Sequence, residues 1–589
     1  MTGRGRLFFL IIILLLLTAT VFAQQLQYTL ALDEELWETF KVNIRVSDLH
    51  RSRLVFSMPI WIPGSYFVGT YGDKVINFTA VGPDGADLPV EKLSKSDWEV
   101  QTKGVSDVSV SYDVLTSRHG FMGRALDSTG ALVQGVTTWM YVRGLEKLPA
   151  RVHVNPPSGW DVAVALPATD KPNDFRAKNY DELADSPILM GTLQDTVFYC
   201  YDKPHEIWFR GEAEFSRKDF TRMVEKIVKH EIDMFGVAPY DRYVFQFTLM
   251  PGFRGGGGLE HANSTSIGLS AVKIMQDVKN AAEVTAHEFF HVWNVKRITS
   301  DQLLPLRYDR EARMESLWWL EGVTSYYAAL TLIRSGIWSP DEFLKKIARE
   351  IEILQENPDR LQTTLAQASW NIWEKGYGGT GISYYNKGEL VGMLLDLTMR
   401  KVTDNQKSLD DVFDYLWQNY ALQHRGFADD DLEKVVEKVS GKDFGPFFDR
   451  YVTGLIELPY REIMGLAGVD VTLEKKPTPT IGRVRFLGER NRIFSLDDNG
   501  PAARAGLRRG DLLVSADGQK ITSREVLADI ILNKAIGDTL VIVATRNGSD
   551  IRFDVVVDQF DKVNCDLKFN ENATEEQLRI RNSWLYLDR

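Results

Sequence analysis

The feature that most restricts the fold of this chain is the sequence His287-Glu288-Phe289-Phe290-His291. Residues four apart lie on one face of an α-helix, so the two imidazoles can reach one metal ion if this segment is helical. The flanking residues 280–286 and 292–296 favour a helix as well. Glu288 would then lie beside the metal, where it can act as a general base on water. The alternative, a helix surface with two histidines and a solvated Glu, stays open until a third ligand is found.

A catalytic zinc site usually has three protein ligands and one open position. The best candidate for the third ligand is Glu321, which stands in the apolar stretch 317–327, Leu-Trp-Trp-Leu-Glu-Gly-Val-Thr-Ser-Tyr-Tyr. A carboxylate in such surroundings is costly to bury unless it is paired or binds a metal. Glu311 and Glu315 are the rivals, but they lie among charged residues, where exposure to solvent explains them. We therefore predict one zinc ion per chain, held by the two histidines and Glu321.

A run of glycines suggests where a substrate backbone approaches. Residues 255–258 are all Gly, and Leu259, Glu260 and His261 follow them. Glycines beside a strand permit close approach of another backbone, so we expect a Gly-rich turn that contacts substrate through Gly257 and Gly258. Glu260 and His261 complete this predicted substrate site, with the Glu260 carboxylate facing a cationic amine. A flexible loop is the alternative, and a phosphate loop is excluded because no Gly-Lys-Ser/Thr follows.

A pair of tyrosines, Tyr384-Tyr385, opens an expected helix and precedes Asn386-Lys387-Gly388. A Tyr hydroxyl is a suitable donor to the developing oxyanion of a tetrahedral intermediate. Adjacent tyrosines in isolation are more often packing residues. The residues alone therefore leave both roles open.

Changes in sequence pattern divide the chain into domains. Residues 24–205 alternate apolar and polar residues between Pro/Gly turns, which predicts an N-terminal β-sandwich-like domain. Residues 206–461 are predominantly helical after a single clear strand, and residues 462–560 return to short strands, as in a small β-rich domain. Residues 561–589 form a tail without an assigned role. The predicted fold class is multidomain α+β.

The first 23 residues have the pattern of a cleaved secretory signal. Two arginines precede the apolar run Leu7–Leu17, and small residues lead up to Ala23. The apolar run is too short for a comfortable membrane span, although a retained anchor is the alternative. We expect an exported protein, periplasmic or secreted, with no stable membrane span after cleavage.

Charge and cysteine content exclude two further classes of protein. The formal charge of −12 argues against nucleic acid as the main partner, which would require a basic face. Two cysteines, Cys200 and Cys565, are too few for a disulfide framework. Whether these two form one long-range disulfide or remain separate thiols stays open.

Four motifs occur in the following order: Gly-Gly-x-Glu-His, His-Glu-Phe-Phe-His-Val-Trp-Asn-Val-Lys-Arg, Trp-Trp-Leu-Glu-Gly-Val-Thr-Ser-Tyr-Tyr and Tyr-Tyr-Asn-Lys-Gly-Glu-Leu-Val. Together they resemble the glycyl aminopeptidase family of zinc metallopeptidases, relatives of the thermolysin-like gluzincins that carry a C-terminal PDZ domain. The resemblance extends to Trp61–Tyr66 and to Asp185-Ser186-Pro187, and it covers nearly the whole mature chain. It implies a thermolysin-like zinc peptidase domain over residues 206–461.

The resemblance also implies roles for single residues. The spacing between the second His and Glu321 is longer here than in the broader gluzincins, and we expect two helices joined by a loop over residues 299–306 to accommodate it. The implied roles are zinc ligands for His287, His291 and Glu321, general base for Glu288, binding of the substrate α-amine for Glu260, and transition-state donor for Tyr385.

The third domain resembles a bacterial PDZ module. Residues 499–513 and the following Asp517-Gly518 carry this resemblance. PDZ grooves capture chain termini by adding a strand to a sheet edge. We place the carboxylate-binding loop at Gly465–Gly468. A peptide C-terminus, an intramolecular contact or a purely structural role stay open for this domain.

The leading functional prediction is an exported zinc aminopeptidase that acts on peptides with a free N-terminus. A preference for small first residues, Gly or Ala, comes from the family resemblance alone. One alternative is a zinc endopeptidase of the same fold. Another, of a different class, is a PDZ-bearing peptide-binding or scaffold protein whose metal site is idle. The natural substrate and the oligomeric state do not follow from the sequence.

Overall fold

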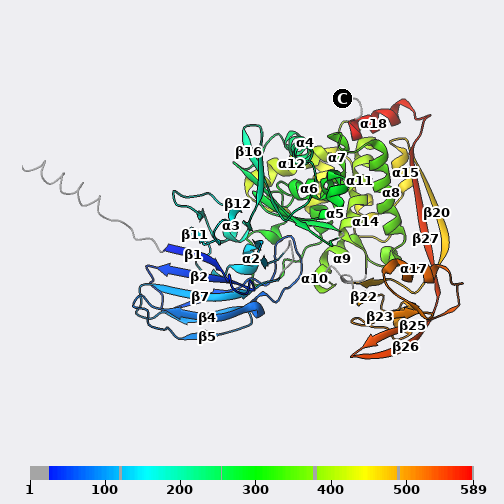
Figure 1. Ribbon diagram of the computed structural model, residues 1–589. Helices are drawn as coiled ribbons and strands as arrows, with labels where there is room; N and C mark the ends of the chain where they lie inside the picture. The colour runs from blue at the N-terminus through cyan, green and yellow to red at the C-terminus, as the bar shows by residue number, and fades with distance from the viewer. Residues whose placement is uncertain (1–24, 118–122, 254, 376–380, 487–490, 587–589) are drawn as a thin grey trace, which may run out of the picture.

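The computed structural model describes residues 25–117, 123–253, 255–375, 381–486 and 491–586. The predicted signal segment lies outside these residues. The described chain forms an N-terminal β domain, a central domain of one sheet and many helices, and a C-terminal β domain (Figure 1). The predicted multidomain α+β class is therefore confirmed.

The N-terminal domain is a β-sandwich with a third sheet beside it. Alternate residues of facing strands, among them Ile44 and Phe56, pack into one core. The sheet orders are β13-β11-β1-β2-β7-β4, β10-β3-β6-β5 and β12-β14-β9-β8. The elements are β1 (Gln25–Leu32), β2 (Thr39–Ser47), β3 (Arg53–Ser57), β4 (Val75–Val81), β5 (Val90–Lys92), β6 (Asp97–Gln101), β7 (Val108–Leu115), β8 (Ala125–Asp127), β9 (Gly130–Val133), α2 (Gly135–Thr138), β10 (Tyr141–Val142), β11 (Ala150–Val154), β12 (Asp161–Val164), β13 (Asp174–Ala177), α3 (Tyr180–Ala184) and β14 (Ile188–Gly191).

The central domain contains one sheet of order β15-β16-β17-β19-β18. Its inner strands are parallel, whereas β18 pairs antiparallel with β19 at one edge. The glycine run expected as a turn is therefore mostly an edge strand. The strands are β15 (Gln194–Cys200), β16 (Lys203–Arg210), β17 (Tyr243–Met250), β18 (Gly256–Glu260) and β19 (Ser264–Ser270).

Helices cover this sheet and bury a large aromatic and aliphatic core. A reciprocal capping box between Ser339 and Glu342 starts α8, and the Asp411 carboxylate accepts the backbone N–H of Ser408 at the start of α12. The helices are α4 (Arg217–Phe235), α5 (Ala271–Gln276), α6 (Ala282–Phe290), η4 (Trp318–Val323), α7 (Thr324–Arg334), α8 (Pro340–Gln355), η5 (Pro358–Leu361), α9 (Leu365–Trp370), α10 (Ile372–Lys375), α11 (Tyr384–Val402), α12 (Leu409–Asn419), α13 (Asp431–Ser440), α14 (Gly445–Tyr451) and α15 (Tyr460–Gly465).

The N-terminal domain is fixed to the central sheet by direct contacts. The Gln246 side chain on β17 donates hydrogen bonds to the carbonyls of Ala163, at 2.9 Å, and Pro187, at 3.0 Å. Trp208 of β16 packs against a small apolar cluster of the third N-terminal sheet, which includes Leu132. The two domains therefore share buried contacts rather than a flexible linker.

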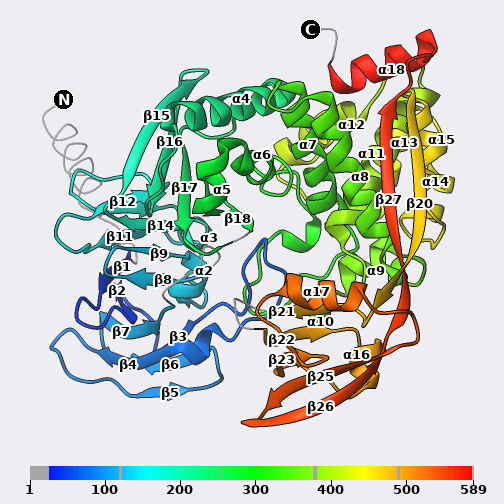
Figure 2. The ribbon, with the colours of Figure 1, turned by 45° about the vertical axis from the view of Figure 1, so that its right-hand side comes forward.

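The C-terminal boundaries differ from the prediction. Strands β20 (Val469–Thr480) and β27 (Asp558–Phe569) pair along their whole length as an antiparallel ribbon beside the central domain (Figure 2). Helix α18 (Glu575–Leu585) follows and buries Trp584, whose indole N–H donates to the Tyr326 hydroxyl at 2.7 Å. The segment predicted as a tail thus completes the core of the central domain, because its apolar residues are buried there.

The C-terminal domain is inserted between the two ribbon strands and has its own core. A cavity of about 400 Å³ lies between β21 and α17, beside Gly482, whose φ is +86°. The prediction of a carboxylate-binding loop at residues 465–468 is wrong. These residues pack against α18, where Arg581 donates hydrogen bonds to the carbonyls of Ala467 and Gly468. The elements are β21 (Val484–Phe486), β22 (Ile493–Leu496), α16 (Pro501–Arg504), β23 (Leu512–Ala516), β24 (Gln519–Lys520), α17 (Arg524–Leu532), β25 (Thr539–Arg546) and β26 (Ser549–Val556).

Cys200 and Cys565 are both buried and both free. They lie on β15 and β27, and the structure therefore resolves the open question in favour of two separate thiols. Within the described residues, none of the helices combines the length and the apolar character that a membrane span requires.

The inserted topology predicts that the C-terminal domain can be removed cleanly. Thr480 and Asp558 are the last paired residues of the ribbon, so an Asn-Gly turn that replaces residues 481–557 should close a hairpin. We expect this variant to keep the thermal unfolding midpoint of the central domain. A chain ending at residue 461 should be far less stable, since loss of the Trp584 side chain alone costs about 3–5 kcal/mol. Equal instability of both variants would contradict the prediction.

Candidate metal centre

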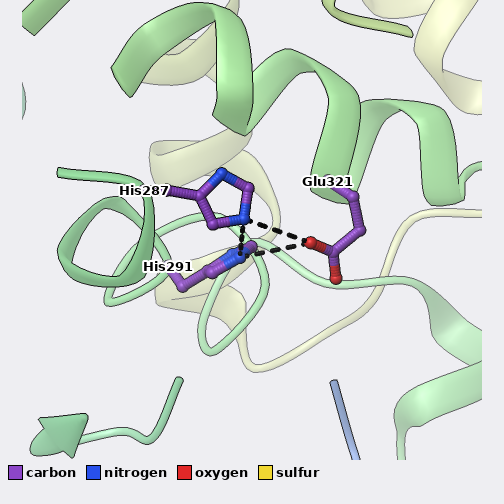
Figure 3. Close-up of side chains that lie close together, drawn as sticks. All are labelled: His287, His291 and Glu321. Carbon is purple, nitrogen blue, oxygen red and sulfur yellow. Dashed lines mark hydrogen bonds and ion pairs between the residues drawn. The ribbon is translucent and has the colours of Figure 1, made fainter. Parts of the chain in front are cut away.

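Three side chains converge on one point between α6 and η4 (Figure 3). The Nε2 atoms of His287 and His291 lie 3.0 Å apart. Oε2 of Glu321 lies 3.5 Å from Nε2 of His287 and 3.3 Å from Nε2 of His291. The structure therefore brings together the three residues predicted as metal ligands, although a long and mostly irregular segment separates Glu321 from the helix of the two histidines.

The triangle of donor atoms fits a zinc ion. Ligand bonds of about 2.0–2.1 Å in tetrahedral geometry separate neighbouring donor atoms by about 3.3–3.4 Å. The donor set, two imidazoles and one carboxylate, is one that catalytic zinc sites use. Within the described part of the chain, Oε1 of Glu321 is buried and accepts no hydrogen bond, as suits a carboxylate whose partner is a cation.

Helix α6 carries His287 and ends at Phe290, with His291 as its C-cap residue. The predicted continuation over residues 292–296 is not helical, because the chain turns so that the carbonyl of Asn294 accepts the Nδ1–H of His291 at 2.6 Å. This hydrogen bond directs Nε2 toward the metal position. The amide of the same Asn294 donates to the carbonyl of Trp319 and the hydroxyl of Thr324, both at 3.0 Å. One side chain thus connects the helix of the histidines to the segment of Glu321.

Glu321 lies in a π-helical turn, η4, which runs into α7. Such turns are frequent at functional sites. A Cβ at Gly322 would lie 2.6 Å from the Cα of Gly388, and a Cβ at Gly388 would lie 2.8 Å from the carbonyl of Trp318. The backbones of η4 and α11 are therefore in contact, and only glycine fits at the crossing. This contact sets the position of Glu321 relative to α11.

Glu288 and Glu260 line the site beside the metal triad. Their carboxylates and an imidazole nitrogen of His291 lie within 4.8 Å of one another. A Cβ at Gly258 would lie 2.4 Å from Cδ of Glu288, so strand β18 passes directly against the predicted general base. A Cβ at Gly64 of the N-terminal domain would lie 2.5 and 2.6 Å from the two carboxylate oxygens of Glu260.

The buried carboxylates give the centre a negative electrostatic potential. Burial raises the pKa of Glu288 well above its usual range and that of Glu260 to about 7. Burial also raises the pKa of Glu321, but the imidazoles of His291 and His287 outweigh it and bring the value down to about 2. Burial alone would lower the pKa of His291, yet the nearby carboxylates raise it to about 10. The centre thus favours a positive charge at the point where the ligands meet.

The Tyr385 side chain lies next to the histidines. Its ring centroid is 6.0 Å from that of His287, on the side of α11 that faces the metal centre. The neighbouring Tyr384 is buried, with its ring centroid 4.7 Å from that of Tyr385. Of the two adjacent tyrosines, Tyr385 is thus the one that the structure places against a metal ligand.

His261, expected in the substrate site, has a different environment. Its ring Nδ1 bonds to Asp185 of the N-terminal domain at 3.1 Å, and the imidazole is buried at the interface between the two domains. Successive residues of a strand face opposite sides, so Glu260 faces the metal centre while His261 does not. The structure therefore places His261 at the domain interface instead of in the predicted substrate site. Gly257, next to Gly258 on the edge strand β18, pairs with Gly268 of β19.

The sequence pattern indicates no role for Gly64, Asp185 and Asn294. Gly64 and Asp185 lie in the segments 61–66 and 185–187, which carried only the family resemblance. The contacts of these two residues with Glu260 and His261 cross a domain interface, and such contacts leave no periodic pattern in the sequence. Asn294 lies three residues beyond the second histidine, and its role depends on the unpredicted end of α6.

Each of the three domains matches a known protein family. Residues 27–192 match the peptidase M61 N-terminal domain, residues 280–391 match the M61 glycyl aminopeptidase family, and residues 465–557 match the PDZ domain. All three metal-ligand candidates, Glu288 and Tyr385 lie within the second match. The first and third matches agree with the N-terminal and C-terminal domains.

Among solved structures, an aminopeptidase N family protein from Idiomarina loihiensis is similar over 95% of this chain and 100% of that chain, with a TM-score of 0.82 and 26% identity. Two curated relatives are named serine protease Do-like HtrA, from Lactobacillus helveticus (36% identical over 59 residues) and Bacillus subtilis (28% over 141 residues). They match 10% and 22% of this chain, which spans only 14% and 30% of their lengths. From the domain matches and the geometry of the centre, the chain belongs to the M61 glycyl aminopeptidase family of metallopeptidases and carries a C-terminal PDZ domain.

Proposed function

We propose that this protein is a zinc-dependent aminopeptidase that removes the first residue of peptides. The observation that carries the proposal is the position of Glu260. Its carboxylate lies beside the metal triad and is covered by the backbone of Gly64 from the N-terminal domain. A buried carboxylate at this position suits a cationic α-amine, and the backbone of Gly64 lies directly against its two oxygens.

Each polar group of the site has one task in this proposal. When bound by His287, His291 and Glu321, zinc would polarise the scissile carbonyl and acidify water. Glu288 takes a proton from the attacking water and delivers it to the leaving amine. Tyr385 donates a hydrogen bond to the oxyanion that develops on the carbonyl.

Strand β18 offers a docking edge for the substrate backbone. It pairs only with β19 in the described sheet, so its outer edge can accept an added strand. Gly256 and Gly257 have no side chains to obstruct that approach. Gly258 lies against Glu288, so a bound peptide would pass beside the general base.

Substrate preference and export are further parts of the proposal. A preference for Gly or Ala in the first position is supported by the name of the family that the catalytic segment matches. Export to the periplasm or the medium is supported by the pattern of residues 1–23. N-terminal sequencing of protein recovered outside the cytoplasm should begin at Gln24, and a retained Met1 would contradict export with cleavage.

The primary test is a cleavage panel on the purified protein. Dipeptide and tripeptide substrates beginning with Gly, Ala, Leu or Arg are compared with their N-acetylated counterparts. We expect stepwise release of the first residue from free peptides, fastest for Gly and Ala, and little cleavage of acetylated ones. Internal cleavage of acetylated peptides at equal rate would instead establish an endopeptidase.

Zinc dependence is tested with two variants that separate binding from chemistry. His291→Ala removes a ligand, so metal analysis should show loss of the single zinc ion and activity should disappear. Glu288→Gln leaves all three ligands in place, so it should retain zinc while kcat falls by several orders of magnitude, because a general base alone contributes about 10²–10⁴-fold. Full activity of a metal-free wild-type protein would refute zinc dependence.

The role of Tyr385 is tested by removing its hydroxyl. Tyr385→Phe should lower kcat by about 10²–10³, the usual effect of losing one oxyanion donor, with little change in KM. Tyr384→Phe is the matched control on the neighbouring, buried ring and should have much the smaller effect on kcat. The reverse outcome would assign the donor to Tyr384.

The role of Glu260 is tested on substrates with and without a free amine. Glu260→Ala should lower kcat/KM for free-amine peptides by a factor equivalent to about 2–4 kcal/mol, the cost of losing one partner of a desolvated charge pair. Slow cleavage of N-acetylated peptides should change little, because these never engage the carboxylate. An equal loss on both kinds of substrate would show that Glu260 does not recognise the amine.

A further inference from the structure

Asp185 of the N-terminal domain contacts the central domain at two places that flank the metal centre. It caps the C-terminal end of α3, and its side chain is mostly buried. Oδ1 accepts a hydrogen bond from Nζ of Lys296 at 2.7 Å and bonds to Nδ1 of His261 at 3.1 Å. Oδ2 accepts the backbone N–H of Ala262 at 2.8 Å. One carboxylate is thus shared by donors from two separate segments.

These donors belong to the segments that carry the reactive groups. His261 and Ala262 directly follow Glu260, the last residue of β18, so their hydrogen bonds to Asp185 fix the end of the strand that carries Glu260. Lys296 lies in the turn that ends the helix of the metal-binding histidines, and its backbone N–H bonds to the carbonyl of His291 at 3.1 Å. Asp185 therefore ties the strand of Glu260 to the helix of the metal ligands.

The N-terminal domain also limits the movement of Glu260 from the other side. Gly64, with φ of +89°, leaves no room for a Cβ against either oxygen of the Glu260 carboxylate. The indole N–H of Trp61 donates to the carbonyl of Arg307 at 2.8 Å, which anchors this loop to the central domain. Glu260 is consequently held between a loop and a carboxylate that both come from the N-terminal domain.

We infer that Asp185 is a positioning residue that sets the distance from the Glu260 carboxylate to the metal centre, and that the N-terminal domain thereby determines recognition of the substrate amine. This inference rests on the proposed function of Glu260. It predicts that loss of the Asp185 charge impairs amine recognition specifically, while metal binding survives.

The chemistry of the contact indicates which substitution to use. An Asn at position 185 has one accepting oxygen in place of two, so its NH₂ group must face a donor, either Ala262 N–H or the pair Lys296 and His261. Asp185→Asn therefore preserves size but breaks part of the contact. Asp181→Asn is the matched control, since Asp181 lies on the same helix and accepts from Tyr308 of the central domain at 3.0 Å.

The experiment compares two inhibitors that differ only in the amine, alanine hydroxamate and propionohydroxamate. Both present the same metal-binding group. The inhibition constant of propionohydroxamate divided by that of alanine hydroxamate therefore measures amine recognition. In the zinc-loaded enzyme, Asp185→Asn should reduce this ratio by about tenfold or more, as for a weakened charge pair, with zinc content and propionohydroxamate inhibition unchanged. Asp181→Asn should retain the wild-type ratio.

The outcomes separate this inference from the proposed function. A wild-type ratio near one would refute amine recognition by Glu260, and the inference would fall with it. A large wild-type ratio that collapses in Glu260→Ala but persists in Asp185→Asn would overturn the inference alone. If Asp185→Asn does not fold, Lys296→Gln removes one donor of the same contact. A lowered ratio in that variant supports the inference, and an unchanged ratio overturns it.

Discussion

The structure depends on keeping several carboxylates buried around two imidazoles. Glu260, Glu288 and Glu321 are almost fully shielded from solvent, and carboxylates in such a setting are costly unless a cation compensates them. The His287, His291 and Glu321 donor atoms meet at distances that suit one metal ion. The surrounding helices and the edge strand hold these groups at fixed separations, so binding the ion requires little rearrangement.

Two glycine contacts show how that rigidity is achieved. Gly322 and Gly388 bring η4 and α11 into backbone contact, which fixes Glu321 relative to the helix of Tyr385. Gly258 brings β18 against Glu288 in the same way. Each contact removes a layer of side chains between two elements, and a single added methyl group would separate groups that must act together.

The domains have unequal relations to the centre. The N-terminal domain contributes to it directly, through Gly64 and Asp185, whereas the PDZ domain is attached through the β20–β27 ribbon and an ion pair of 3.5 Å between Arg483 and Asp359. The side chain of Arg524 donates a hydrogen bond to the carbonyl of Phe486 at 2.7 Å, beside the cavity between β21 and α17. A ligand that adds a strand there would have to compete with this contact.

The sequence by itself determined the chemistry and the order of the domains. The spacing of His287 and His291, and the apolar surroundings of Glu321, identify ligands because helical periodicity and the cost of a buried charge are local properties. Only the tertiary structure decided that His261 faces a domain interface, that Asp185 contacts both sides of the centre, and that Trp584 belongs to the central core. These facts depend on contacts between residues tens to hundreds of positions apart, which are set by packing and leave no periodic pattern in the chain.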